Sequence, residues 1–398
     1  MESLLITYRN RLEYTDNKFV RYLMPQIQWE ERLSGIIGAR GTGKTILMLQ
    51  YIKQNLDPAK AFYVSLDNLY FANNRLVDLA CKLRQEGVTH LFIDEVHKYP
   101  YNTWAQELKN IYDSYPEIHV VFSGSSILKI YEGNAGLDGK AIEYELFGCS
   151  FREFLAFEGV KNLPVVSLED LLTCHVEIAS DITSAIKVMP LFQSYLQHGY
   201  FPYYKEGLPN YGRKLVNTIN AVLESDLPAT VNIEFASVQK LKRLLGIIAG
   251  LAPFAPNMSQ LGASVNILRS NLPKSLLLLE RARMLGLLRA GGKNLSPLSK
   301  PAKIYLDNPN LAFALGNEDT NMDNLRKTFF YNQLRTVSTV TDAQKGDFTV
   351  NGQFIFEVGG KSKTFAQIAN IPYSYLALDE IEIGLGNRIP LWMFGLLY

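Results

Sequence analysis

The chain has few cysteines and no apolar run long enough to cross a membrane. Its 398 residues include 3 cysteines, Cys81, Cys149 and Cys174, which form no CxxC pair and have no histidine at metal-ligand spacing. We expect all three to be buried as small hydrophobic residues in a reducing cytoplasm. The most apolar stretch, residues 244–255, contains two glycines and a proline and is too short to span a bilayer. The N-terminal residues lack the apolar core of a signal peptide, so we expect a cytoplasmic protein without a membrane partner.

The sequence also has almost no net charge, and it contains no repeat and no low-complexity segment. Its formal charge is +1, with 47% hydrophobic and 20% charged residues, which is the composition of a globular protein. A single hydrophobic core stops growing beyond about 250–300 residues. The length therefore predicts two to three domains.

Four short apolar segments alternate with longer amphipathic ones in the first part of the chain. They are residues 34–37, 61–66, 90–93 and 119–122. This βαβ alternation predicts an α/β fold in which helices cover both faces of a parallel sheet. The pattern turns helical from 151 to 235, and three more helical segments follow between 237 and 288. Residues 302–398 mix short strands with one helix near 325–336, which is typical of a small α+β domain.

The first apolar segment is followed by a sequence that matches GxxxxGK[ST]. Its glycines let backbone N–H groups turn inward around a phosphate, where side chains would clash. We expect Lys44 to reach the β- and γ-phosphates and the Thr45 hydroxyl to ligate Mg²⁺, while the next helix favours phosphate through its N-terminal dipole. The expected nucleotide-binding residues are Gly38, Ala39, Arg40, Gly41, Thr42, Gly43, Lys44 and Thr45.

A motif of this length arises by chance in roughly one chain per hundred of this size, so its context decides the interpretation. The third apolar segment ends in Asp94 and Glu95, at the carboxyl edge of the expected sheet, where open α/β sheets bind ligands. We expect Asp94 to complete the Mg²⁺ shell and Glu95 to polarise the water that attacks the γ-phosphate. An apolar strand that ends in acids is a weak signal alone. Together with the glycine-rich motif it predicts a nucleotide site.

The fourth apolar segment ends in hydroxyl side chains. Ser123 or Ser125 either senses the γ-phosphate and orients the water, or is a simple turn residue, and the sequence leaves both interpretations open. The NKxD motif that reads guanine does not follow the glycine-rich segment. This favours ATP over GTP as the ligand.

Several motifs together resemble a prokaryotic family of AAA+-like ATPases, over nearly the whole chain. They are GARGTGKT at 38–45, FIDEVHKYP at 92–100, VFSGSS at 121–126, SFREFLAF at 150–157 and YLDNPNLAFAL at 305–315. The resemblance implies a P-loop ATPase domain at 1–160, a helical region at 161–236, a winged helix at 237–303 and a restriction-nuclease-like, PD-(D/E)xK domain at 304–398. It also implies a phosphate-contacting arginine after the fourth strand. This sequence offers only Lys140 there, and the alternative, Arg152, is expected to be solvated on a helix surface.

Residues 237–303 are strongly basic. They contain 11 Lys or Arg and one acid, so the segment carries 11 − 1 = +10 and the remainder about −9. A run of charged residues usually lies on a solvent-exposed face without a binding role. Positive charge concentrated in one segment, however, indicates a polyanionic partner such as duplex DNA.

The helical pattern of the same segment fits a helix-turn-helix. We expect one helix at 258–265, a turn at Asn266, a second helix from about Leu272 with Asn271 as its cap, and a wing tip at 291–293. The candidate nucleic-acid contacts are Lys274, Arg281, Arg283 and Lys293. Winged helices also dock proteins, so a protein partner of unknown identity is the alternative.

The tail resembles its nuclease family in the acids but not in the lysine. Asp347 and Glu357 match the two acids, whereas Gly359 occupies the lysine position and Lys327 stands near the place of the helix glutamate. A two-residue turn between the strands points the acids to opposite faces, and a three-residue loop brings them to one face. Lys361 is an even number of positions from Glu357, so it falls on the same face of a strand. It remains open as a substitute for the missing lysine. We expect a structural domain with a degenerate, inactive site.

Two functions remain open for the nucleotide site. In the first, the chain hydrolyses ATP with Mg²⁺, and Glu95 and Lys44 carry the catalysis with help from Ser123 or Ser125. In the second, the chain is a nucleotide-gated regulator that binds DNA or a protein with little turnover. The oligomeric state is also left open, a homo-oligomer included.

Overall fold

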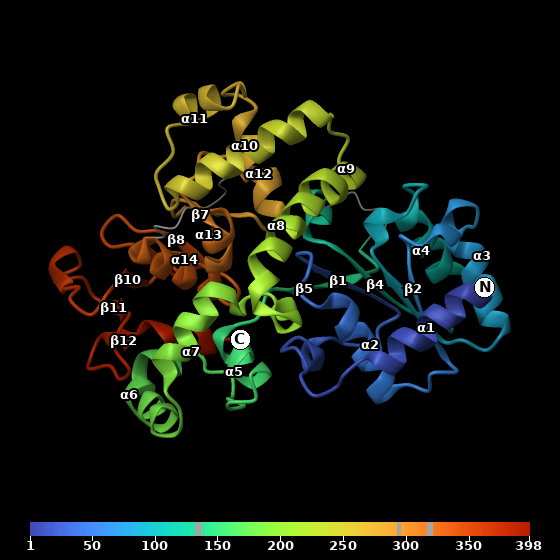
Figure 1. Cartoon of the computed structure of the whole chain (residues 1–398), viewed down its shortest axis with the longest axis horizontal. Coiled ribbons are helices and arrows are strands. Elements are labelled where there is room, and N and C mark those ends of the chain that lie inside the picture. The colour runs from blue at the N-terminus through green and yellow to red at the C-terminus, as the bar shows by residue number, and fades with distance from the viewer. Residues whose placement is uncertain (132–136, 138, 293–295, 317–320) are drawn as a thin grey trace. The chain divides into compact units, whose positions relative to one another are not determined.

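The computed structural model describes residues 1–131, 137, 139–292, 296–316 and 321–398 (Figure 1). The chain divides into two compact units. The first contains Met1–Phe147 and Glu224–Ile233, and the second contains Gly148–Leu223 and Glu234–Tyr398. The helical, winged-helix and nuclease-like regions expected from the sequence therefore fall in the second unit, apart from Glu224–Ile233, and so do residues 148–160.

The first unit is an α/β structure around one parallel sheet. Its helices are α1 (Glu2–Tyr14), α2 (Lys44–Asn55), α3 (Leu76–Gln85), α4 (Trp104–Ser114) and α9 (Leu227–Thr230). Its strands are β1 (Leu33–Gly38), β2 (Ala61–Ser65), β3 (His90–Asp94), β4 (His119–Ser125) and β5 (Ile142–Leu146), in the order β2-β3-β4-β1-β5. All neighbours are parallel. The expected parallel α/β sheet is thus confirmed. The sequence did not indicate β5, because its segment IEYEL contains two glutamates and lies mostly at the surface.

The strand order explains why helices cover both faces. The chain passes from β1 through α2 to the edge strand β2, and then returns through α3 and α4 to β4, beside β1. Parallel crossovers are right-handed, so the reversal of direction puts α2 on one face of the sheet and α3 and α4 on the other (Figure 1). Helix α1 packs against α2 and β2. The carboxyl ends of all five strands meet at one edge, where the P-loop lies.

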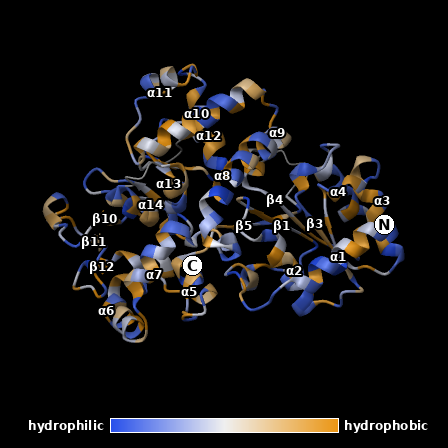
Figure 2. Cartoon of the chain, viewed as in Figure 1, coloured by the Kyte–Doolittle hydropathy of each residue, from blue (hydrophilic) through white to orange (hydrophobic). Residues whose placement is uncertain are grey.

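Hydrophobic side chains of the strands form the core of this unit. Strands β1, β3 and β4 are buried along nearly their whole length, as expected for strands covered on both faces. In Figure 2 hydrophobic colour is concentrated in these strands, whereas the helices alternate between hydrophobic and hydrophilic sides. Ile36, Phe92 and Phe122 are completely buried between the layers.

The second unit combines helices with two sheets. Its helices are α5 (Phe151–Phe157), α6 (Leu168–Ala185), α7 (Val188–Ser194), α8 (Tyr211–Ala221), α10 (Phe235–Leu251), α11 (Met258–Ser264), α12 (Leu272–Arg281), α13 (Pro309–Leu315) and α14 (Met322–Leu334). Strands β6 (Leu285–Leu288) and β7 (Lys303–Leu306) form an antiparallel pair. The other sheet has the order β12-β11-β10-β9-β8, from β8 (Val340–Asp342), β9 (Phe348–Val350), β10 (Phe354–Gly359), β11 (Ser374–Leu378) and β12 (Arg388–Pro390).

The expectation that all three cysteines are buried is wrong for two of them. Cys149 is buried, whereas Cys81 is half-buried and Cys174 is exposed, because Cys174 lies outside the buried face of α6. Within the described ranges, no helix is both long and apolar enough to cross a membrane.

Candidate functional site

The glycine-rich segment turns sharply between the end of β1 and the start of α2. A Cβ on Gly38 would lie 2.4 Å from the Leu146 carbonyl oxygen, so only glycine fits there. Gly43 directly precedes α2 with a φ of 96°, in the left-handed region that glycine adopts without strain. This turn places the first N–H groups of α2, which have no partner inside the helix, at the carboxyl edge of the sheet.

Lys44, the first residue of α2, is buried beneath this loop. Its Nζ donates hydrogen bonds to the carbonyl oxygens of Gly38 at 3.0 Å and Ala39 at 2.9 Å. Burial lowers the pKa of Lys44, while the nearby carboxylates of Glu95 and Asp94 act in the opposite direction. The ammonium group therefore sits where a P-loop lysine meets the phosphates.

The hydroxyl of Thr45 lies directly beside the carboxylate of Asp94. Thr45 Oγ1 donates to Asp94 Oδ2 at 2.6 Å, and the Tyr63 hydroxyl donates to the same oxygen at 2.7 Å. The Ser123 hydroxyl donates to the other carboxylate oxygen. Hydroxyl and carboxylate oxygens suit Mg²⁺, so Thr45 and Asp94 fit the protein's share of a shell that nucleotide phosphates would complete. The described residues contain no group of three or more His, Cys, Asp or Glu that could hold a metal.

Glu95 follows β3 in an unusual backbone conformation. Its φ is 55°, and a residue other than glycine in this region carries strain of about 1–3 kcal/mol. Its side chain is 23% exposed, and Oε2 lies 3.2 Å from His97 Nε2. Glu95 lines a cavity of about 400 Å³ together with Arg40, Thr45 and Asp94.

The two serines at the end of β4 have different neighbours. Ser123 contacts Asp94, whereas the backbone N–H of Ser125 donates to His97 Nδ1 at 3.3 Å. The Ser125 hydroxyl accepts a hydrogen bond from the Ile127 N–H at 3.4 Å. Ser123 therefore holds the carboxylate of Asp94 in place. Ser125 contacts His97 through its backbone.

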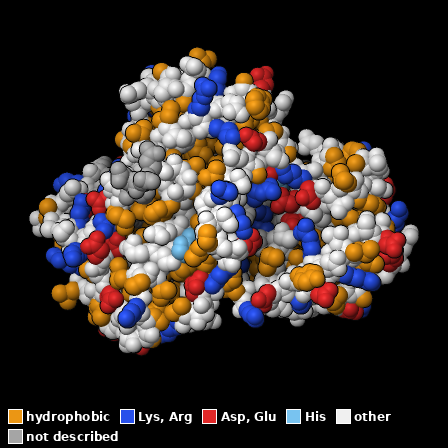
Figure 3. All heavy atoms as spheres, in the orientation of Figure 1, with side chains coloured by type: hydrophobic (Ala, Val, Ile, Leu, Met, Phe, Trp, Pro, Cys, Tyr) orange, Lys and Arg blue, Asp and Glu red, His pale blue; other side chains and the backbone are white. Residues whose placement is uncertain are grey.

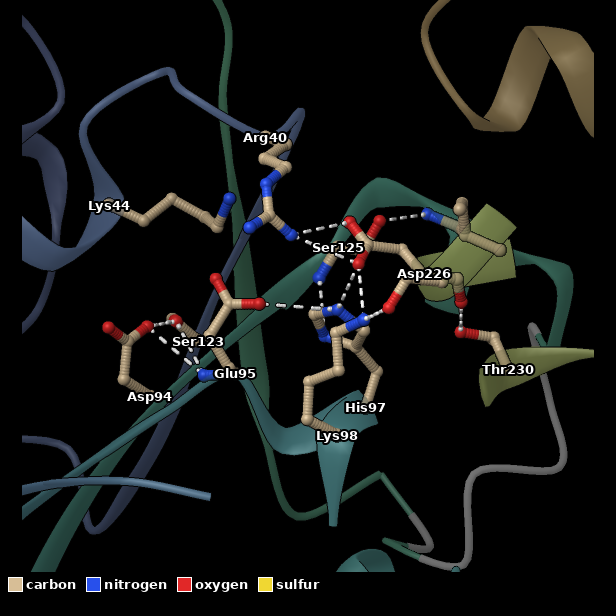
Figure 4. A network of polar contacts seen from close by, with 12 residues as sticks. Arg40, Lys44, Asp94, Glu95, His97, Lys98, Ser123, Ser125, Asp226 and Thr230 are labelled. Atoms are coloured by element: carbon tan, nitrogen blue, oxygen red, sulfur yellow. Dashed lines mark hydrogen bonds and ion pairs between the residues drawn. The ribbon is translucent and has the colours of Figure 1, made fainter. Parts of the chain in front are cut away.

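Sequence reasoning missed several residues of this site. Arg21 is buried and donates to the carbonyl oxygens of Thr42 and Phe147, so it supports the P-loop from behind. Lys98, His97 and Asp226 form a polar network next to Glu95 (Figure 4). The sequence VHKYP directly after Asp94-Glu95 was a signal for Lys98 and His97. No local pattern pointed to Asp226.

The two cations considered for phosphate contact lie elsewhere. Lys140 pairs with Asp113 and stands 5.1 Å from the centre of the Tyr112 ring. Asp113 and Tyr112 lie in the last turns of α4. Helix α4 ends at the edge of the sheet opposite the P-loop, so Lys140 is far from the phosphate site. In the second unit, Arg152 donates to the carbonyl oxygens of Tyr398 at 2.9 Å and Leu163 at 3.2 Å. The expectation of a solvated Arg152 is therefore wrong, because its guanidinium group is bound to the backbone of Tyr398 and Leu163.

The nucleic-acid candidates in the second unit differ in exposure. Lys274 is exposed and Arg281 is half-buried on α12. Arg283 was expected at the surface, but its side chain is only 17% exposed and lies 4.0 Å from Asp307. Its left-handed φ of 58° after the helix end turns the side chain toward that buried carboxylate. Lys293 lies outside the described residues.

Two further details of this segment differ from expectation. Asn271 precedes α12 as predicted, but its side chain makes no capping hydrogen bond. Part of the positive charge is also neutralised, because Arg289 forms two bonds to Glu280, at 3.0 and 2.7 Å.

The acids of the tail lie on one face of the sheet. Val350 pairs with Phe354, so a three-residue loop connects β9 to β10, the alternative that brings the acids to one face. Phe348 pairs with Phe356 in the same ladder, which sets Asp347 and Glu357 opposite each other.

Each of these acids is paired with a lysine. Lys327 Nζ lies 2.6 Å from Asp347, and Lys363 Nζ lies 2.6 Å from Glu357. Lys361, the substitute considered from the sequence, is exposed. A Cβ on Gly359 would lie 3.0 Å from Lys363, so the glycine that stands where the resemblance implies a lysine makes room for Lys363.

The match to a known protein family lies mainly in the first unit. Residues 30–155 match the family described as AAA domain. None of the curated proteins matches the chain. Among solved structures, AMPPCP-bound DnaA from Aquifex aeolicus is 14% identical with a TM-score of 0.29, over 67% of this chain and 92% of that chain.

Two other structural matches are similarly distant. The S. cerevisiae Hsp104–ADP complex is 15% identical with a TM-score of 0.30, over 69% of this chain and 37% of that one. A katanin structure is 15% identical with a TM-score of 0.26, and the match covers 39% of this chain and 57% of the katanin chain. Such scores say nothing about function. Residues 30–155 are thus similar to the AAA domain family, and the strand order and the glycine-rich loop agree with a P-loop nucleotide-binding fold.

Proposed function

We propose that the chain is a Mg²⁺-dependent ATPase whose nucleotide state controls its second unit. The observation that carries this proposal is the convergence of Thr45, Asp94 and Glu95 on one cavity beside the P-loop. The Lys44 ammonium is buried under the same loop, on the carbonyl oxygens of Gly38 and Ala39. These are the groups that phosphoryl transfer to water requires. The family match of residues 30–155 supports the same proposal.

The residues divide the chemistry among them. The P-loop N–H groups and Lys44 hold the β- and γ-phosphates and neutralise their charge. Thr45 and Asp94 would hold Mg²⁺, which when bound neutralises the charge that develops on the phosphoryl oxygens. Glu95 accepts the proton of the attacking water as general base. Ser123 fixes the orientation of Asp94 through its hydrogen bond.

A second candidate function is a nucleotide-gated binding protein with little turnover. The basic segment 237–303 favours it, since a regulator needs a surface for its target. Phosphate release by the full chain, measured with and without duplex DNA, separates the two candidates. Turnover that continues over many cycles supports the ATPase, and binding of ATP without release of phosphate supports the regulator.

For the second unit we propose a winged helix at 237–303 and a nuclease-like domain at 304–398. The order α10–α11–α12–β6–β7 supports the first, as does the bridge between Phe254 and Ile304, which adds a short third strand to the β6–β7 pair. In Figure 3 the Lys and Arg side chains over this region are scattered among hydrophobic and uncharged ones. Such a surface suits weak phosphate contacts rather than a base-reading helix.

We predict that the basic segment binds duplex DNA weakly and with little sequence preference. Its affinity should fall steeply with salt, because contacts to phosphates release counterions. The double change Lys274→Ala/Arg281→Ala should flatten the slope of log K against log salt by about one unit per lost phosphate contact. Lys60→Ala/Lys82→Ala, which removes two exposed lysines of the first unit, serves as the charge-matched control. No binding even at low salt would leave protein docking as the role of this surface.

We also predict that the tail does not cut DNA. Asp347 and Glu357 each hold a lysine at 2.6 Å, which competes with a metal ion for the carboxylate oxygens. Plasmid incubated with the full chain, ATP and Mg²⁺ or Mn²⁺ should remain supercoiled. Cleavage that disappears in Asp347→Ala would contradict this prediction, whereas cleavage that persists would indicate a contaminating nuclease.

A further inference from the structure

The segment Glu224–Ile233 belongs to the first unit although both of its ends continue into the second. It begins in a π-helical turn, η8 (Val222–Asp226), and ends after α9. Such turns are rare and are frequent at functional sites. Through α9 the segment packs on the short helices that follow β3 and β4, η3 (Val96–Lys98) and η4 (Ser126–Tyr131).

Asp226 is the buried centre of a cluster of cations (Figure 4). Its side chain is 1% exposed, and Oδ1 lies 3.1 Å from Arg40 and 2.5 Å from Lys98. Burial by itself would raise the pKa of Asp226, but hydrogen bonds and charges from His97 and Lys98 outweigh it and hold the pKa well below its usual range. Asp226 is therefore an anion that holds two cations in place.

Both of these cations belong to the nucleotide site. Arg40 lies in the P-loop itself, and Lys98 ends the short helix η3 (Val96–Lys98) that follows Glu95. Together with Ser225, which accepts a hydrogen bond from Lys98 at 2.7 Å, they line the same 400 Å³ cavity as Thr45 and Glu95. In the proposed ATPase, a P-loop that holds the β-phosphate would direct the γ-phosphate into this cavity.

The cluster also reaches the proposed general base. His97 Nε2 lies 3.2 Å from Glu95 Oε2 and 3.7 Å from Asp226 Oδ1. His97 thus stands between the carboxylate of the segment and the carboxylate that would polarise water. A change in the position of Asp226 would move both the cations and the neighbour of Glu95.

Building on the proposed ATPase function, we infer that Asp226 is a positioning residue of the nucleotide site. It holds Lys98 and Arg40 as the cations that contact the γ-phosphate from within the same chain, and so it links the segment Glu224–Ile233 to the presence of ATP. Preorganised cations at a transferred phosphoryl group are a main source of catalysis in such sites. ADP lacks the phosphate that these cations would meet.

The test compares Asp226→Asn, Lys98→Ala and the double variant with the wild-type chain. Asp226→Asn should lower kcat for ATP hydrolysis by about tenfold or more, because small misplacements of positioned groups cost up to about a hundredfold. Its affinity for ADP should stay within about twofold of wild type. Because Asp226 acts through Lys98 as well as Arg40, the double variant should lose less activity than the product of the two single losses. Glu86→Gln, which removes an exposed carboxylate just after α3, is the control and should leave kcat unchanged.

Several results would overturn the inference. An unchanged kcat in folded Asp226→Asn, or independent losses that multiply in the double variant, would reduce Asp226 to a structural ion pair. If Asp226→Asn does not fold, Lys98→Ala decides: its affinity for a non-hydrolysable ATP analogue should fall at least about tenfold more than its affinity for ADP. Equal losses for both nucleotides would contradict the inference. A wild-type chain that binds no ATP would overturn the proposed function as well.

Discussion

Replacement of Glu95 by glutamine is expected to leave ATP bound and to stop its hydrolysis. The amide keeps the size of the side chain but cannot accept the proton of the attacking water. General bases contribute about 10²–10⁴-fold to such reactions, so kcat should fall at least about a hundredfold. Phosphate release measures turnover, and calorimetry with ATP measures binding in the same preparation.

The matched control for this experiment is Glu86→Gln, which removes the same charge from an exposed site of the same unit. It should hydrolyse ATP at the wild-type rate. Equal turnover in Glu95→Gln and wild type would remove Glu95 from its role as general base. Loss of ATP binding in Glu95→Gln would instead assign Glu95 to holding the nucleotide.

Replacement of Lys44 by alanine should abolish nucleotide binding. The variant removes the buried ammonium group that we propose meets the phosphates, and truncating one partner of a buried charge pair costs about 2–5 kcal/mol. The affinity for ATP and for ADP should therefore fall at least about thirtyfold. Calorimetry of the folded variant, checked by its melting temperature, gives the result.

Lys82→Ala, which removes an exposed lysine from α3, should bind both nucleotides as the wild type does. Undiminished ATP binding by Lys44→Ala would show that the phosphates do not lie on the P-loop. If Lys44→Ala loses binding and the melting temperature of the nucleotide-free variant also falls, Lys44 is needed for the fold itself.

The sequence predicted the parts of the site that depend on local patterns. The four central strands follow from short apolar segments, and the P-loop from a glycine-rich motif between a strand and a helix. The end of β3 follows from two acids after an apolar run, since the carboxyl edge of a parallel sheet is where ligands bind. These features involve residues close in the chain, so they can be recognised without the fold.

The parts that the sequence did not indicate depend on long-range packing. Asp226 meets Arg40 across 186 positions of the chain, and no periodicity or motif connects them. Lys363 pairs with Glu357 from six positions further along the chain, because Gly359 leaves room for its side chain. Arg283 was expected at the surface and turned inward to Asp307, which lies in a different element.

The most direct test of the central claim is equilibrium binding of ATP to the full wild-type chain in the presence of Mg²⁺. We predict saturable binding of one nucleotide per chain, displaced by ADP, weakened when Mg²⁺ is chelated and lost in Lys44→Ala. GTP should bind less well than ATP. A chain that shows no saturable ATP binding, or that binds ATP equally well after Lys44→Ala, would contradict the assignment of this site.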